Sequence, residues 1–598
     1  MTKFAQSLRI GGASGFWGDA DMATAQLLQA KNLDFIVYDY LAEITMAILA
    51  RARAQDPDKG YVADFITAAM APNLPEIAAQ GVRIISNAGA MNPLACAAAL
   101  RDEIARQGLD LSVACVTGDD LMPQLGTITA QNPRDMFSDA PFPNPDKIAS
   151  INAYLGAFPI AAALKTGADI VITGRCVDSA VTLAACIHAF GWQADNLDLL
   201  AAGSLAGHIL ECGPQATGGN FTDWQLVADT LTNIGYPIAH IHPNGSFDVT
   251  KPSGTGGLVS RATVGEQMLY EIGDPQAYVL PDVICDFSAV TLTDIGPDLV
   301  RVTGARGRGV PDTFKTCTTW HDGYRGGHLF GYYGLDAEAK ATLFSQTALT
   351  RARTALAAQN MPDFTQTSVE ILGAEAQFGA QRQSAPSREV AAKIAVRHPQ
   401  AAGISVFIQQ ATGLGLAAPP GLSGFAGARP KPSPVLALFS CLTPKAQITI
   451  LLHDACGATP FSASENAPVA PAVLRPSPPA FPQGATVLQP LVNLSWARSG
   501  DKGDSANIGL IARHPAYLPA LWHGITDDLL HDVFGHFHPT RINRYLLPGT
   551  HALNIVLHNV LGGGGTSSLR NDPQAKGYAQ LLLAASIAIN PDLIEETK

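Results

Sequence analysis

The chain has 598 residues, of which 47% are hydrophobic and 15% are charged, and its formal net charge is −12. This composition excludes a disordered protein, and the length predicts two or more domains. Because phosphate contacts need a basic surface, the acidic balance argues against nucleic acid as a partner.

Cysteine usage and hydropathy indicate a cytoplasmic protein. The nine Cys residues are scattered without a CxxC pair or a close Cys/His cluster, which is typical of reduced, mostly buried thiols. Residues 1–5 lack the apolar core of a signal peptide, and no apolar run is long enough to span a membrane. We therefore expect a cytoplasmic location and no membrane partner.

The first half of the chain has the pattern of parallel α/β units, in which short Val- and Ile-rich runs precede helical segments. Strands are predicted at 8–10, 35–38, 82–86, 111–116 and 168–173. Helices are predicted near 20–29, 93–107, 151–166, 180–190 and 199–209. In such sheets ligands bind beyond the carboxyl ends of the strands, so a site is expected there.

Polar side chains stand at all five predicted strand ends. They are Ser14, Asp39, Glu43, Asn87, Asn92, Asp119, Asp120, Arg175 and Asp178. A single residue of this kind is ordinarily a helix cap or a turn former. Because the ends of parallel strands share one edge, five ends together favour a common site. Its candidate catalytic residues are Asn87, Asp119, Arg175 and Asp178.

A second group of candidates follows the helix predicted at 199–209. Glu211 is either a general acid–base residue or a structural, paired carboxylate. Cys212 is either a nucleophile or an inert buried thiol. His208 lies one turn before Cys212, where a packed histidine is more common than a catalytic one. His240 and His242 lack further ligands at metal-binding spacing, so no metal site is expected.

Two glycine-containing loops lie between a strand-like run and a helix, where backbone amides can bind an anion. Neither has the GxGxxG spacing or the Walker pattern. Each is therefore either an anion cradle or a tight structural turn. The candidate cofactor-binding residues are Gly11, Gly12, Ser14, Gly15, Gly254, Thr255, Gly256 and Gly257.

The middle of the chain predicts a mixture of strands and helices. An Asn-Gly pair at 244–245 predicts a hairpin turn, and a second hairpin is expected at 289–303. The loop at 304–309 carries two Arg residues and either holds an anion or is a solvated turn. A long helix is predicted at 336–359. Strand-like runs follow at 368–372, 405–408 and 447–452.

These patterns divide the chain into three parts. Residues 1–456 form an α/β domain, with a parallel part at 1–275 and an α+β part at 276–456. The Pro-rich residues 457–484 indicate a linker. Residues 485–598 predict a small ferredoxin-like α+β domain.

The small domain has its own predicted elements. They are a hairpin at 491–513, a helix at 526–537, strands at 542–546 and 552–560, and a helix at 576–587. Its loops at 497–505 and 561–570 are rich in Gly and in polar or charged residues, and each is either an anion nest or a hairpin tip.

Several long motifs resemble the AtuA family, named for acyclic terpene utilisation. In the main domain they are Ile172-Thr173-Gly174-Arg175 with Asp178, Leu210-Glu211-Cys212-Gly213 with Thr217-Gly218-Gly219, Thr250-Lys251-Pro252 with 254–259, 265–275, and 302–307. The run from Ala497 to Asp504 is similar to the AtuA-like ferredoxin-fold domain that often accompanies this family. The resemblance covers nearly the whole chain outside the Pro-rich linker. It implies a mostly parallel α/β fold with flanking helices, an α+β section and a small ferredoxin-like domain.

The resemblance also implies a role in breaking down branched acyclic terpenoids, which are handled as acyl-CoA thioesters. We therefore expect a catabolic enzyme with a CoA thioester as substrate, acid–base chemistry of the hydratase or lyase type, and a homo-oligomeric state. No other cofactor is predicted. The alternatives are a non-catalytic binding or scaffold subunit of an acyl-CoA-processing complex, and a nucleotide-using kinase or ligase.

Overall fold

The computed structural model describes residues 7–19, 21–383, 386–424, 429–462, 471–481 and 483–596. Its main domain is built on an 11-stranded sheet in the order β11-β12-β8-β7-β1-β2-β3-β6-β4-β19-β20. The five central strands are parallel. They are β1 (Leu8–Gly12), β2 (Phe35–Tyr38), β3 (Arg83–Ala90), β6 (Ile170–Gly174) and β4 (Val113–Thr117). The five strands predicted from the sequence are therefore confirmed.

Helices cover both faces of the parallel centre, which explains why its strands read as continuous apolar runs. On β2, Ile36 and Tyr38 pack into one core with α1, α2, α3 and α4, whereas Phe35 and Val37 pack into the other with α6, α7 and α8. The first set is α1 (Met22–Gln29), α2 (Glu43–Gln55), α3 (Leu74–Gln80) and α4 (Pro93–Arg106). The second is α6 (Ala157–Lys165), α7 (Ala180–Phe190) and α8 (Leu197–Leu210).

Antiparallel strands extend the parallel centre on both sides. Beyond β1 lie β7 (Ile238–Ile241), β8 (Phe247–Thr250), β12 (Leu299–Thr303) and β11 (Thr291–Gly296). Beyond β4 lie β19 (Leu451–Asp454) and β20 (Gly457–Pro460). Because β20 pairs with β19, the linker predicted to begin at residue 457 begins only after this strand.

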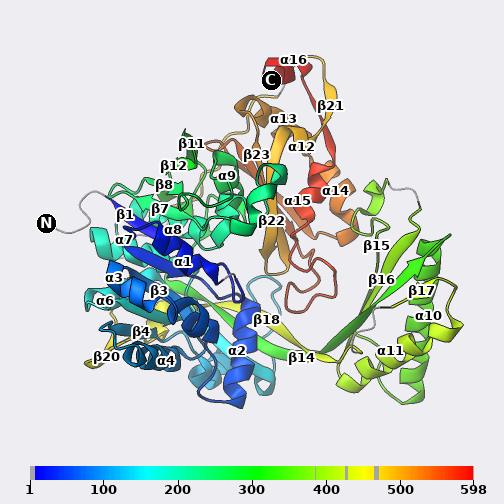
Figure 1. Ribbon diagram of the computed structural model, residues 1–598. Coiled ribbons are helices and arrows are strands. Elements are labelled where there is room, and N and C mark those ends of the chain that lie inside the picture. Colours follow the sequence, from blue (N-terminus) through cyan, green and yellow to red (C-terminus); the bar gives the residue numbers. More distant parts are fainter. Residues whose placement is uncertain are drawn as a thin grey trace.

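A long bent strand, β14 (Thr313–Tyr333), connects the main body to an outlying lobe (Figure 1). Its first half pairs with β5 and β18, and its second half pairs with β16 and β17. The partners are β5 (Ile148–Ala153), β18 (Ser433–Pro444), β16 (Glu389–His398), β17 (Leu422–Ser423) and, next to β16, β15 (Gln366–Leu372). Two helices, α10 (Ala337–Ala358) and α11 (Ala401–Gly413), pack on the lobe.

Two predictions in these regions were wrong. The run at 405–408 belongs to α11, where Ile404, Phe407, Ile408 and Ala411 face the core at helical spacing. The stretch 151–166 begins as the end of β5, because residues 148–153 pair with β14, and its helix begins only at Ala157.

The C-terminal domain has a four-stranded antiparallel sheet in the order β22-β23-β25-β24. The strands are β22 (Ser495–Lys502), β23 (Ser505–Ala512), β24 (Arg541–Leu547) and β25 (Ala552–His558). Its helices include α13 (Leu518–Gly524), α14 (Asp527–Phe534) and α15 (Tyr578–Leu583). The expected final helix is shorter than predicted, because Ser586–Ile589 forms β26 and pairs with β21 (Val487–Pro490).

The remaining elements are short. They are α5 (Leu125–Gln131), α9 (Arg261–Leu269), α12 (Leu491–Leu494), α16 (Pro591–Glu596), β9 (Tyr278–Val279), β10 (Ile284–Asp286) and β13 (Arg306–Gly307). The last three strands form a small sheet of their own, in the order β13-β10-β9.

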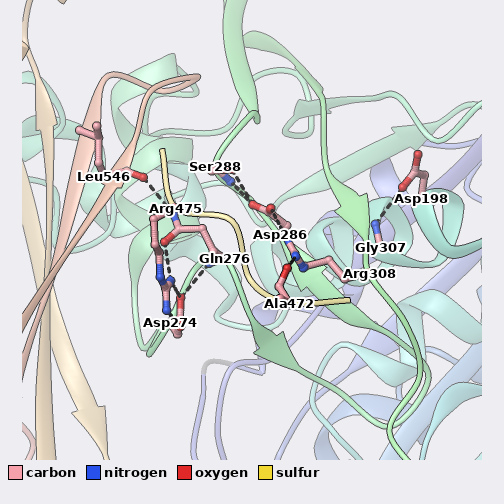
Figure 2. A network of polar contacts seen from close by, with 10 residues as sticks. All are labelled: Asp198, Asp274, Gln276, Asp286, Ser288, Gly307, Arg308, Ala472, Arg475 and Leu546. Atoms are coloured by element: carbon pink, nitrogen blue, oxygen red, sulfur yellow. Dashed lines mark hydrogen bonds and ion pairs between the residues drawn. The ribbon is translucent and has the colours of Figure 1, made fainter. Parts of the chain in front are cut away.

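The described linker residues 471–481 contact both domains: the Pro479 carbonyl oxygen lies 2.9 Å from His523 Nε2 of the C-terminal domain, and Arg475 binds the main domain (Figure 2). The Arg475 guanidinium donates two hydrogen bonds of 2.6 Å to Asp274 and one of 2.8 Å to Gln276. The amide of Gln276 in turn donates to the carbonyl oxygen of Leu546 in the C-terminal domain at 3.0 Å. This part of the linker therefore helps to join the two domains.

Candidate functional site

The carboxyl ends of the parallel strands form a buried polar cluster, as the sequence predicts. The Asn87 amide on β3 donates to Asp39 after β2 at 2.5 Å, and its oxygen accepts from the backbone amide of Tyr40 at 2.9 Å. The Ser14 hydroxyl donates to the Asp39 carbonyl oxygen at 3.0 Å. Burial raises the pKa of Asp39 well above its ordinary value, and the nearby Asp178 carboxylate adds to this rise.

Asp119 holds the end of β6 in place. Its Oδ2 accepts from the Asn152 amide and from the backbone amide of Arg175, both at 2.9 Å. Gly174 is needed beside it, since an added Cβ would lie 2.2 Å from Asp119 Oδ1. Burial raises the pKa of Asp119 to about 7, although these hydrogen bonds oppose the rise. Asp119 is thus enclosed within the protein, where it fixes the backbone at Arg175, and a catalytic role for it stays a prediction.

Arg175 and Asp178 form the central ion pair of the site. The buried Arg175 guanidinium donates to Asp178 at 2.6 Å and to the Cys176 carbonyl oxygen at 2.7 Å, and it stacks 4.1 Å above the Tyr154 ring. The Asp178 side chain is 39% exposed, whereas that of Arg175 is 4% exposed. A buried cation therefore holds a carboxylate that remains accessible.

Sequence reasoning missed Tyr154 and Lys315, which complete this part of the site. The Tyr154 hydroxyl donates to Glu43 at 2.8 Å, and Lys315 lies 3.5 Å from the same carboxylate. Burial raises the pKa of Glu43, but Lys315 and Arg175 outweigh burial and lower it to about 2. Lys315 comes from β14, whose passage along the sheet edge has no local signal in the sequence.

Glu211 and His208 form a second, separate pair at the end of α8. His208 Nδ1 and Glu211 Oε1 are 2.7 Å apart. Burial lowers the pKa of His208, but the Glu211 carboxylate outweighs it and the net shift is upward. Burial also raises the pKa of Glu211. The two side chains therefore retain a proton between them more strongly than either would alone.

Cys212 lies beside this pair but lacks the environment of a nucleophile. Burial raises the pKa of the thiol well above its ordinary value, and the Glu211 and Glu271 carboxylates raise it further. A thiol attacks as the thiolate, which this environment disfavours. The prediction of a catalytic Cys212 therefore has no support from its surroundings.

The first glycine loop packs against the site. An added Cβ on Gly12 would lie 2.6 Å from the Leu210 carbonyl oxygen, and one on Gly15 would lie 3.0 Å from the Cys212 backbone. The Gly15 amide donates to the loop's own Asp19 at 2.9 Å. A Cβ on Gly11 would meet the side chain of Leu27 at 2.9 Å. Gly11, Gly12 and Gly15 thus allow close packing, with Ser14 bound to Asp39, and cofactor binding by this loop stays a prediction.

The second glycine loop, residues 254–257, is occupied by contacts within the chain. The Thr255 hydroxyl donates to Pro252, and Lys251 donates to the Thr255 carbonyl oxygen and pairs with Asp298. A Cβ on Gly256 would clash with Thr230, and one on Gly257 would clash with Thr217. None of the hydrogen bonds described for Gly254 to Gly257 involves the strand-edge residues. The structure therefore does not bring this loop into the site.

The C-terminal domain reaches the site through the hairpin of β22 and β23, which points down toward the sheet edge in Figure 1. The Asn507 side chain accepts from the Glu271 backbone amide at 2.8 Å and donates to the Leu269 carbonyl oxygen at 2.7 Å. An added Cβ on Gly500 would lie 2.6 Å from the side chains of both Tyr270 and Glu271. The hairpin is thus closely docked on the end of α9.

Lys502, at the tip of this hairpin, lies among the residues of the main-domain site. Its ammonium is 5.3 Å from the centre of the Tyr278 ring, which is 6.1 Å from the His208 ring. Burial lowers the pKa of Lys502, but Tyr278 and the surrounding carboxylates outweigh burial and raise it above that of an ordinary lysine. Sequence reasoning marked the loop at 497–505 but did not place it here.

The part of the chain that the structure describes holds neither a metal-binding cluster nor a membrane-spanning helix. Within those residues, no group of three or more His, Cys, Asp or Glu side chains is placed to hold a metal ion. Among the same residues, no helix has the length and hydropathy needed to cross a membrane.

The fold and the site define a class of protein: an α/β domain with a parallel-sheet centre, whose strand-edge site is shared with a C-terminal ferredoxin-like domain. Residues 8–453 match the model of the acyclic terpene utilisation family protein AtuA, and residues 489–588 match the AtuA ferredoxin-like domain. The chain belongs to the AtuA family, so the resemblance to this family and to its ferredoxin-like domain is confirmed. No curated protein and no solved structure matches the chain.

Proposed function

We propose that this chain is an enzyme of acyclic terpene breakdown that performs acid–base chemistry on a CoA thioester. The observation that carries the proposal is the proximity of two carboxyl groups, Asp178 and Glu211, that have different surroundings. The helix α8, which ends just before Glu211, packs against the residue after Asp178, since an added Cβ on Gly207 would lie 2.8 Å from the Ser179 Cα. The Asp178 carboxylate also adds to the rise that burial causes in the pKa of Glu211. Asp178 is ion-paired with Arg175 and accessible. Glu211 lies 2.7 Å from His208. Paired acid and base groups of this kind are typical of catalytic sites.

Hydration of a 2-enoyl thioester fits these two groups. The Asp178 carboxylate takes a proton from water, and the water oxygen bonds to the β-carbon. The electrons of the C=C bond move to the thioester oxygen and form an enolate, whose α-carbon then takes the proton held by the His208–Glu211 pair. The reverse sequence eliminates water, which is the lyase direction. In both directions a proton returns through solvent, so atoms and charge balance.

Membership of the family supports the substrate class, because the family is named for acyclic terpene utilisation and acyclic terpenes carry methyl branches. Activation of a branched acid as a thioester lowers the cost of forming negative charge on its carbonyl oxygen. A cation near that oxygen would lower it further. The thioester and the hydratase or lyase chemistry are parts of the proposal.

The test uses the purified full chain with CoA thioesters of short branched 2-enoic acids. Hydration is followed by the loss of the enoyl absorbance and by the mass gain of one water. Asp178→Asn should lower kcat by about 100-fold, as expected for loss of a general base, and leave the Tm within a few degrees. The exposed Asp110, at the opposite edge of the sheet, provides the control variant Asp110→Asn. Absence of turnover by the wild type with the whole series would contradict the proposal and favour the non-catalytic alternative.

A further inference from the structure

Basic side chains surround the carboxylates of the strand-edge site, and most of them are paired. Arg175 lies 2.6 Å from Asp178, His208 2.7 Å from Glu211, Lys315 3.5 Å from Glu43, and Lys576 3.1 Å from Glu271. Lys502 makes no ion pair with any residue that the structure describes, and its ammonium lies over the face of the Tyr278 ring. Lys502 is thus the cation of this site that is available to another anion.

The position of Lys502 is fixed by the loop that follows β25. The Asp504 carboxylate accepts from the Gly563 amide at 2.7 Å, and the Asp504 carbonyl oxygen accepts from the Val560 amide at 3.0 Å. Gly564, with φ +72°, lies so close to the hairpin that an added Cβ would be 2.6 Å from the Gly503 carbonyl oxygen. The glycine-rich stretch at 561–565, which resembles an anion nest in the sequence, therefore binds the protein's own carboxylate.

The contacts of the 561–565 loop with the hairpin tip are a reason to regard Lys502 as positioned for function. A lysine at a hairpin tip is ordinarily solvated and mobile. Here the hairpin is held by the 561–565 loop on one side and by Asn507 and Gly500 against α9 on the other. A cation held in a fixed place beside several carboxyl groups is typical of residues that meet a ligand.

We propose that Lys502 binds the acyl carbonyl oxygen of the substrate, where negative charge collects, so that the two domains together build one active site. The reaction that Lys502 serves rests on the proposed function, but its preference for an anionic acyl group does not. A preorganised cation at the oxygen that gains charge stabilises an enolate more than it stabilises the neutral thioester. The same cation also binds a free carboxylate in place of the enolate.

The test compares two small probes on the full chain by isothermal titration calorimetry: β,β-dimethylacrylate and its neutral primary amide. We expect the wild type to bind the carboxylate about 10-fold more tightly than the amide, the ratio given by one charge-assisted contact. Lys502→Met should remove this preference, and Lys502→Arg should keep most of it. The control is Lys165→Met, an exposed lysine at the end of α6 near the opposite edge of the sheet.

Equal binding of the two probes by the wild type, absence of carboxylate binding, or an unchanged preference in Lys502→Met would each overturn the assignment. The Tm of each variant shows whether it is folded, and Lys502→Gln replaces Lys502→Met if the latter is not. Turnover separates the two proposals. If binding prefers the carboxylate through Lys502 but no thioester is hydrated, the assignment of Lys502 stands and the proposed reaction is contradicted. If thioesters are hydrated but Lys502→Met changes neither kcat nor the preference for the carboxylate, the proposed reaction stands and the assignment of Lys502 is overturned.

Discussion

The buried ion pair between Arg498 and Glu266 should be the strongest single contact between the two domains. The side chains are 4% and 0% exposed, and their charged atoms are 3.1 Å apart. Arg498 also donates to the Gly219 carbonyl oxygen at 2.7 Å and to Gln215. Arg498→Met would leave Glu266 buried with the Thr222 amide as its remaining hydrogen-bond donor. Removing one partner of such a pair costs about 3–5 kcal/mol.

With an m value of about 2 kcal/mol per M, a loss of this size lowers the urea midpoint by about 1.5–2.5 M. Burial already raises the pKa of Glu266, and Arg498 opposes that rise. Without Arg498 the pKa should rise further, so the folded variant would hold a proton that the unfolded chain releases. The stability deficit should therefore grow as the pH rises through the new folded pKa, and it should be larger at pH 8 than at pH 5.5.

The assay is urea denaturation followed by far-UV circular dichroism, with hydrogen exchange of residues 495–502 as the local readout of domain docking. Arg498→Met with Glu266→Gln should recover at least half of the loss, because no charge is then left buried. The matched control is Arg513→Met, which breaks the Arg513–Asp223 pair of the same interface. These side chains are 24% and 27% exposed, so a loss of about 1 kcal/mol is expected. A loss below about 1 kcal/mol for Arg498→Met, or no recovery in the double variant, would refute the reasoning.

Three further predictions concern the site. Gly564→Ala places a Cβ against Gly503 and should lower the free energy of unfolding by about 2 kcal/mol. Gly334→Ala, with a positive φ but open space around it, is the control for backbone strain alone. Equal losses in the two variants would show that the 561–565 loop does not hold the hairpin. Burial raises the pKa of Asp119 to about 7, so wild-type Tm should fall relative to that of Asp119→Asn between pH 5 and 8 as the carboxyl ionises; parallel Tm curves would show otherwise. Cys212 should resist a thiol-alkylating reagent at pH 8 while the exposed Cys456 reacts; rapid labelling of Cys212 in the native protein would count against its inert role.

The parallel centre could be predicted because burial on both faces makes a strand such as Phe35–Tyr38 apolar throughout. The grouping of Asn87, Asp119 and Arg175 followed from topology, since they lie where parallel strands end at the same edge of the sheet. By contrast, the short apolar run at 405–408 fits a strand or a helix equally well. Only the spacing of buried residues over the whole of α11 separates the two.

The residues missed by sequence reasoning come from elements that approach the site through tertiary contacts. Lys315 arrives on β14 and Lys502 on a hairpin of the other domain, and neither approach leaves a local pattern. Glycine loops were ambiguous for a related reason. The same residues suit an anion nest and a close backbone contact, and the neighbouring atom, such as the Leu210 carbonyl oxygen beside Gly12, decides between them. The acyl-CoA substrate, the cytoplasmic location and the homo-oligomeric state stay predictions.

The docking of the β22–β23 hairpin on α9 has a consequence for the evolution of this architecture. Asn507 and Asn554 bind the backbone at Leu269, Glu271, Ile272 and Gly273, whatever the side chains there. Arg498 and Lys576, in contrast, form ion pairs with the side-chain carboxylates of Glu266 and Glu271, respectively. Exchange of C-terminal domains between relatives should therefore preserve the overall pairing of the domains. Such an exchange should preserve full stability only where both carboxylates and both cations are present together. These four positions are therefore expected to covary among relatives.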